Sequence, residues 1–167
     1  MCRTISDHPF RRPDIAPLMV ARIKTLVNRG FYNGLIFHRV IDGFMAQTGD
    51  PAGTGQGGSD LPDLKSEFSL FPHLRGTVSA ARTGDNYDSA NSQFFIMFMP
   101  RMALDRKYSA FGRVIAGMEY VDAIERGEPP ANPSKIVRAT MAAPDAATPA
   151  TPPAAAINPA EAPQPVK

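Results

Sequence analysis

An arginine stands in the middle of an otherwise apolar alternation in residues 37–50, FHRVIDGFMAQTGD. The alternation is typical of a half-buried strand, and a guanidinium held on such a strand could donate hydrogen bonds to a bound molecule. Charged residues also protect the edges of sheets from pairing with other chains. The residue types alone favour this edge-strand interpretation of Arg39 and leave a catalytic one open.

The residues that share a strand face with Arg39 depend on the turn that follows it. Asp42-Gly43 is a strong hairpin signal. A two-residue turn there would set Arg39 opposite Ala46, whereas a three-residue loop would set it opposite Gln47 and on the same face as Met45. Only the longer loop brings a guanidinium, a thioether and an amide together in one pocket.

Other chemistries are disfavoured by the spacing of the reactive residues. The histidines His8, His38 and His73 have no metal-ligand spacing with one another or with Cys2, and no serine lies in a nucleophile elbow. Carboxylates occur in a polar, proline-containing stretch between residues 50 and 67, where such groups are normally solvated. We therefore expect no metal, no cofactor and no covalent nucleophile.

Residues 53–58, GTGQGG, satisfy the G-x-G-x-x-G pattern of dinucleotide-binding loops. That pattern needs a strand before it and a helix after it. Here Pro51 precedes the glycines and Pro62 follows them, which is typical of a loop. We interpret the segment as a flexible loop beside a site rather than as a nucleotide site.

The composition is that of one soluble globular domain, with 167 residues of which 43% are hydrophobic and 20% charged. A net charge of +2 with scattered Lys and Arg gives no reason to expect nucleic acid or a membrane as a partner. The single cysteine excludes an internal disulfide framework and fits a reducing compartment. We expect a cytoplasmic protein, on the condition that the true N-terminus carries no export signal.

The chain divides into three parts by composition. Residues 1–11 have no regular pattern and form a degenerate N-terminal segment. Residues 12–141 carry the apolar patterns of a folded domain. Residues 142–167 are rich in Pro and Ala, without an apolar period, and are predicted to be a disordered tail.

Helices and short strands alternate within the predicted domain. Residues 17–30 have an apolar stripe at helical spacing, and a shorter helix is predicted over residues 118–126, with Gly127 as its cap. Strand signals occur in LIFHRVI, FMAQ, GTVSAA, SQFFIMF, SAFGRVI and KIVRATM, which are residues 35–41, 44–47, 76–81, 92–98, 109–115 and 135–141. Many short strands with two helices predict a small barrel or sandwich.

Segments spread over residues 12–141 resemble the cyclophilin family of peptidyl-prolyl cis/trans isomerases, most closely its compact bacterial members. They are GFYNGLIFHRVIDGFMAQTGDP, GTGQGGSDLPDLKSEF, RGTVSAARTGDNYDSANSQFFIMF, LDRKYSAFGRVIAGMEYVDAI and PSKIVRATM. The resemblance implies a mainly β fold with two helices, a cyclophilin-like antiparallel β-barrel with a groove on its outer face. It implies an isomerase that accelerates rotation about X-Pro bonds in protein folding, with proline-containing polypeptides as substrates. We expect a monomer.

The resemblance also implies roles for residues of this groove. Arg39 matches the catalytic arginine. The residues that match the walls of the proline pocket are Phe44, Met45, Phe95 and Leu104. The residues that match polar groups holding the substrate backbone are Gln47 and Gln93. Those that match the groove beside the residue preceding proline are Ala81 and Arg82.

Two rim positions differ from animal cyclophilins. Tyr108, a substrate-binding position, stands where they have a histidine, and Ala103 stands where they have the tryptophan associated with cyclosporin binding. The resemblance therefore implies weak cyclosporin binding with an intact peptide groove. Elsewhere, His38 is expected to be structural, and the residues expected in the core are Phe37, Ile41, Phe94, Ile96 and Phe111.

The beginning of the chain departs from the family. Cyclophilins open with an antiparallel strand pair before the first helix, but here the helix signal follows only MCRTISDHPFRRPDIA. A barrel that lacks this pair would be incomplete and would expose strand edges. We expect either a truncated or mis-started form of a complete enzyme or a true variant with an open barrel. The alternative function is a proline-peptide-binding module of little or no catalytic activity, in which the open barrel no longer fixes Arg39.

Overall fold

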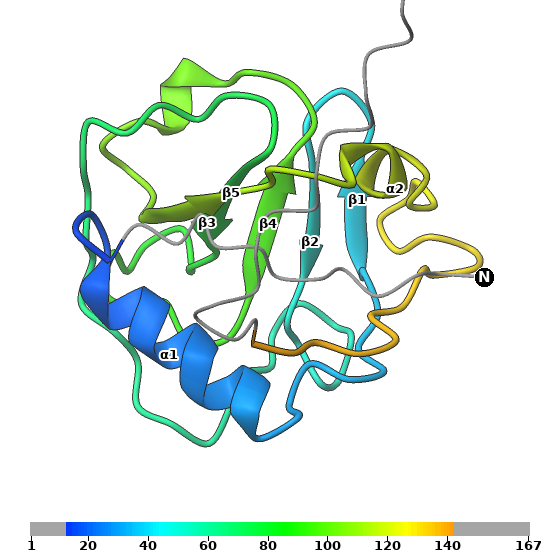
Figure 1. Ribbon diagram of the computed structural model, residues 1–167, viewed down its shortest axis with the longest axis horizontal. Coiled ribbons are helices and arrows are strands. Elements are labelled where there is room, and N and C mark those ends of the chain that lie inside the picture. The colour runs from blue at the N-terminus through cyan, green and yellow to red at the C-terminus, as the bar shows by residue number, and fades with distance from the viewer. Residues whose placement is uncertain (1–12, 142–167) are drawn as a thin grey trace, which may run out of the picture.

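The computed structural model describes residues 13–141. The predictions for residues 1–11 and 142–167 lie outside these described residues. Figure 1 shows the described elements in chain order. They are α1 (Pro17–Asn28), β1 (Arg39–Ile41), β2 (Met45–Thr48), β3 (Thr77–Ala80), β4 (Phe94–Met97), the 3₁₀ helix η1 (Met102–Leu104), β5 (Ala110–Arg113) and α2 (Met118–Asp122).

The five strands form one antiparallel sheet in the order β1-β2-β4-β3-β5. Helix α1 lies below β3, β4 and β5 in the view of Figure 1, and the shorter α2 lies near β1. Among residues 13–141 the sheet does not close on itself, since β1 and β5 are its two ends. This confirms the mainly β fold with two helices, and the sheet formed by the described residues is not a closed barrel. No helix in the described range is long and apolar enough to cross a membrane.

Helix α1 forms as its apolar spacing predicts. Its buried residues Met19 and Leu26 pack on the sheet, and Pro17 occupies the first turn, where a missing backbone donor costs nothing. The helix ends at Asn28 with Arg29 as its C-cap, and Gly30, whose φ is 69°, is the left-handed residue of a Schellman motif that follows it. The N–H groups of Gly30 and Phe31 donate to the carbonyls of Val27 and Leu26.

The sheet buries different residues on its two faces. Val40, Ala46 and Ile96 lie in the main core beneath α1 and α2. Phe95 and Met97, which alternate with Ile96 along β4, belong to a separate cluster on the opposite face. This alternation follows from the strand period of two residues. The sheet therefore carries a second, smaller apolar surface that α1 does not cover.

Two predictions about elements and one about a core residue are wrong. Residues 135–141 form no regular strand. Their pairing with the segment around Ile36 consists of an isolated bridge at Lys135 and the backbone hydrogen bonds of Ile136 to Gly34 and Leu35. Helix α2 ends before residue 126, because Gly127 exchanges two backbone hydrogen bonds with Val40 instead of capping the helix. Ile41 packs beside the second apolar surface rather than in the main core. The other core predictions hold, with Phe94 only partly buried.

Candidate active site

The hairpin between β1 and β2 has the longer of the two loops that the sequence allows. Arg39 pairs with Gln47, and Ile41 pairs with Met45, so a three-residue loop separates the strands. Gly43 takes a φ of 64° in this loop, a conformation that glycine adopts without steric cost. Arg39, Met45 and Gln47 therefore share one face, as the longer loop predicts.

Strand β4 completes the floor of the site. Because β2 pairs with β4, Met45 lies opposite Met97 and Gln47 lies opposite Phe95. Met45, Phe95 and Met97 are almost fully buried together with Ala81. The residues packed against their edges are Ile41, Phe44, Leu104 and Tyr108. The result is an apolar floor with Arg39 and Gln47 beside it.

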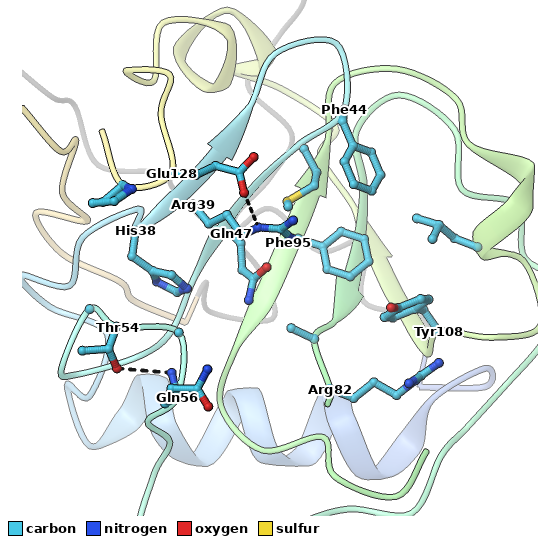
Figure 2. A pocket seen from close by; sticks show the side chains of 16 residues that line it. His38, Arg39, Phe44, Gln47, Thr54, Gln56, Arg82, Phe95, Tyr108 and Glu128 are labelled. Atoms are coloured by element: carbon cyan, nitrogen blue, oxygen red, sulfur yellow. Dashed lines mark hydrogen bonds and ion pairs between the residues drawn. The ribbon is translucent and has the colours of Figure 1, made fainter. Parts of the chain in front are cut away.

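A pocket of about 790 Å³ opens over this floor. Figure 2 shows Phe44, Phe95 and Tyr108 on one side of Arg39, and His38, Thr54 and Gln56 on the other. The structure brings all but one of the predicted site residues to its wall. These are Arg39, Phe44, Met45, Gln47, Ala81, Arg82, Phe95, Leu104 and Tyr108.

Gln93 is the predicted site residue that does not line the pocket. Its amide nitrogen donates to the carbonyls of Gly55 and Gly57, at 3.0 and 2.8 Å, and its oxygen accepts from Nε2 of Gln47 at 2.8 Å. Gln93 therefore links Gln47 to the glycine-rich loop of residues 53–58, called the glycine loop below, from outside the pocket. Gln47 uses one of its two amide N–H donors on Gln93, so its carbonyl oxygen and its second N–H are left for a ligand.

The glycine loop forms one wall of the pocket through Gly53, Thr54, Gly55 and Gln56. It is organised by the buried carboxylate of Asp50, which accepts backbone N–H groups of Ala52, Thr54 and Gly55 at 2.7 to 2.9 Å. Burial alone would raise the pKa of Asp50, but these bonds and those of Gly57 and the Thr54 hydroxyl outweigh it and lower the pKa. The loop is thus folded around an ionised aspartate.

Replacing Asp50 by asparagine will destabilise the fold by about 2 kcal/mol at pH 7, because several N–H groups lose a charged acceptor. A lowered native pKa stabilises the fold above the unfolded pKa of about 3.9, and this contribution is lost as the pH falls through the native value. The difference in the free energy of unfolding between wild type and Asp50→Asn will therefore become smaller below about pH 4.

Urea unfolding at pH 7 and at low pH measures this difference in the free energy of unfolding. Asp60→Asn is the matched control, because the carboxylate of Asp60 is exposed and pairs with Arg29 at the surface. Its effect should stay within about 0.5 kcal/mol. Equal effects of the two substitutions at pH 7 would show that the Asp50 carboxylate does not organise the loop.

Arg82 forms the opposite wall and is held in place. Its guanidinium carbon lies 4.5 Å from the ring centroids of both Tyr87 and Tyr108, an arrangement in which the cation attracts both ring faces. Its Nε donates to the carbonyl of Lys107 at 3.1 Å, and its Nη1 donates to that of Thr83 at 2.7 Å. The side chain is therefore a fixed part of the groove rather than a free charge.

Two lining residues were not predicted as site residues from the sequence. Glu128 accepts a hydrogen bond from Nε of Arg39 at 2.9 Å. His38, predicted to be structural, is buried but also lines the pocket, and neither ring nitrogen has a hydrogen-bond partner among the described residues. Burial lowers the pKa of His38, so its imidazole is neutral at pH 7.

The sequence holds no signal that links Glu128 to Arg39, since 89 residues separate them. The arrangement offers an apolar floor for a compact ring, a cation at its edge and one amide oxygen. The described lining residues include no pair arranged for covalent attack. Such an arrangement suits a compact, partly apolar group that can accept a hydrogen bond.

The comparisons agree with this geometry. Residues 12–141 match the family model for the cyclophilin type peptidyl-prolyl cis-trans isomerase. A probable peptidyl-prolyl cis-trans isomerase of Brucella abortus is 50% identical over 148 residues, which cover 79% of this chain and 75% of the relative. A peptidyl-prolyl cis-trans isomerase-like 1 of Aspergillus fumigatus is 41% identical over 135 residues, with 75% and 83% covered.

Two solved structures are similar in the same region. The cyclophilin AquaCyp293 from Hirschia baltica has a TM-score of 0.72 at 34% identity, over 80% of this chain and 70% of that one. A cyclophilin type peptidyl-prolyl cis-trans isomerase of Cryptosporidium parvum, crystallised in the presence of the dipeptide Ala-Pro, has a TM-score of 0.67 at 28% identity, over 72% and 82%. The chain belongs to the cyclophilin family, as a peptidyl-prolyl cis/trans isomerase of the cyclophilin type.

Proposed function

We propose that this chain isomerises X-Pro bonds of polypeptide substrates in the groove above Met45 and Phe95, with Arg39 as the catalytic residue. The observation that carries the proposal is that the guanidinium lies on the same sheet face as an apolar floor large enough for a proline ring. Folding chains that expose such bonds are the proposed clients, and the cytoplasm is the proposed site of action.

The barrier that the enzyme must lower is the one to rotation about the X-Pro peptide bond, which arises from electron delocalisation. Rotation about a peptide bond costs about 18–20 kcal/mol, because the nitrogen lone pair is delocalised into the carbonyl. As the bond twists, the proline nitrogen becomes pyramidal and regains that lone pair. A fixed guanidinium then donates a hydrogen bond to it more strongly than to the planar ground state, which is selective stabilisation of the transition state. No proton moves and no covalent bond breaks.

The rest of the groove holds the substrate while one side of the bond rotates. Phe44, Met45, Phe95 and Leu104 surround the pyrrolidine ring by apolar contact. The free carbonyl oxygen of Gln47 accepts a backbone N–H of the substrate. We propose that the residue before proline lies along Ala81 and Arg82. Because Ala103 provides no aromatic side chain at its position on the rim, weak inhibition by cyclosporin is expected.

Titration with a proline-containing peptide, followed by the methyl resonances of the methionines, tests where the substrate binds. Met45 lies in the groove, whereas the equally buried Met19 belongs to α1 and packs on the other face of the sheet. An Ala-Pro peptide should shift the Met45 methyl and leave that of Met19 unchanged, and an Ala-Ala peptide should shift neither. Equal shifts at both methionines, or none at Met45, would contradict binding in this groove.

A further inference from the structure

We propose that Glu128 is a positioning residue that holds the guanidinium of Arg39 in its reactive orientation. The inference rests on the proposed catalytic role of Arg39. Figure 2 shows the carboxylate of Glu128 beside Arg39 and joined to it by a hydrogen bond. This bond runs from Nε of Arg39 to Oε2 of Glu128 over 2.9 Å.

It matters for catalysis which nitrogen of the Arg39 guanidinium donates to Glu128. A guanidinium has five N–H donors, one on Nε and four on the two terminal nitrogens. Because Glu128 takes the Nε donor, the terminal N–H groups stay available for the substrate. An arginine side chain has many rotamers, and Arg39 is about half exposed on a strand at the end of the sheet, with a side-chain exposure of 45%. The carboxylate selects one of these orientations.

The backbone under Glu128 is itself fixed against the strand that carries Arg39. Gly127 and Val40 exchange two N–H to carbonyl hydrogen bonds of 2.8 Å. Arg126, on the other side of Gly127, donates from Nε to Asp42 at 3.1 Å. Two prolines, Pro129 and Pro130, follow Glu128 and restrict its backbone further. These contacts hold the backbone of Glu128 at a fixed position relative to β1, and the carboxylate is therefore held near Arg39.

The charges of the pocket leave no substitute for this carboxylate. Among the residues that line the pocket in the described part of the chain, Arg39 and Arg82 are cationic, and Glu128 is the one acidic residue. Arg82 is already held by Tyr87 and Tyr108, and burial keeps His38 neutral at pH 7 by lowering its pKa. Removing Glu128 would therefore leave Arg39 without its anchor in the groove.

The pair is exposed enough that its loss should hardly affect folding. Surface ion pairs contribute little to stability, whereas a misplaced catalytic group lowers the rate strongly. Glu128→Ala should therefore lower kcat about tenfold, with nearly unchanged KM and thermal midpoint. Glu128→Gln keeps an oxygen that accepts the Nε–H and should stay within about threefold of wild type. Glu125→Ala, an exposed glutamate outside the pocket, is the matched control and should leave kcat unchanged.

A double substitution separates this inference from the proposed function. In an Arg39→Ala background, Glu128→Ala should change kcat no further, because the anchor acts only through the arginine. A wild-type kcat for Glu128→Ala, or a loss of kcat that is the same in both backgrounds, would overturn the positioning role while leaving Arg39 as the catalytic residue. An Arg39→Ala variant as active as wild type would instead overturn the proposed function.

Discussion

Replacing Arg39 by alanine will lower kcat for an X-Pro peptide by about 100- to 1,000-fold, the usual cost of removing one donor to a transition-state charge. The effect should fall on kcat rather than on KM, because the guanidinium bonds to the proline nitrogen only as that nitrogen becomes pyramidal. The apolar floor that binds the ring remains intact. The side chain is about half exposed, so the variant should fold normally.

Steady-state kinetics on wild type, Arg39→Ala and Arg39→Lys test this expectation. Lysine keeps the charge but not the planar fork of donors, so Arg39→Lys should recover little of the lost rate. Arg113→Ala removes an exposed arginine from β5, outside the pocket, and serves as the control. A loss confined to KM, or full activity with lysine, would assign Arg39 to binding or to general charge rather than to the proposed hydrogen bond.

Replacing Gly49 by alanine will destabilise the fold by about 3 kcal/mol, from a left-handed backbone cost of about 1–2 and an overpacking cost of about 1–3. Gly49 has a φ of 96°, and a Cβ there would lie 2.4 Å from the carbonyl oxygen of Ser92 and 2.8 Å from Cα of Gln93. Both neighbours are backbone atoms of the two residues that directly precede β4. They cannot move aside without disturbing the pairing of β2 with β4.

Denaturant unfolding of Gly49→Ala and Gly84→Ala measures this cost. A Cβ added at Gly84 would meet no atom within 4 Å, and the φ of Gly84 is not positive, so its substitution should be close to neutral. Because Gly49 leads from β2 into the loop around Asp50, the destabilised variant should also lose activity when it is partly unfolded. Equal stability of both variants would show that the backbones at Gly49 and Ser92 do not approach so closely.

Local patterns were sufficient to predict the scaffold. The apolar spacing of Met19, Ile23 and Leu26 predicted α1, and Gly30 marked its end. Alternation predicted most strands, since those segments bury one face. The patterns failed where pairing depends on distant partners. Gly127 does not cap α2, because its backbone groups bond to Val40, which is distant in the sequence. Residues 135 and 136 pair with the segment around Ile36 without forming a regular strand.

The site was less predictable from local patterns. The hairpin signal at Asp42-Gly43 allowed two registers that place Arg39 opposite different residues, and only the structure shows the pairing with Gln47. The family resemblance supplied the groove residues, but it did not separate Gln93, which supports Gln47 from behind, from residues that line the pocket. Glu128 carries no local signal, because its contact with Arg39 depends on the pairing of Gly127 with Val40 in β1.

Exchange spectroscopy of a peptide with one X-Pro bond, at equal saturation of wild type and Arg39→Ala, tests the central claim most directly. It measures cis/trans rotation on the protein itself and separates rotation from binding. We predict rapid exchange between the bound cis and trans forms with wild type, and exchange slowed at least ~100-fold with Arg39→Ala although the peptide still binds. Equally rapid exchange in both would contradict the claim that Arg39 stabilises the rotating bond.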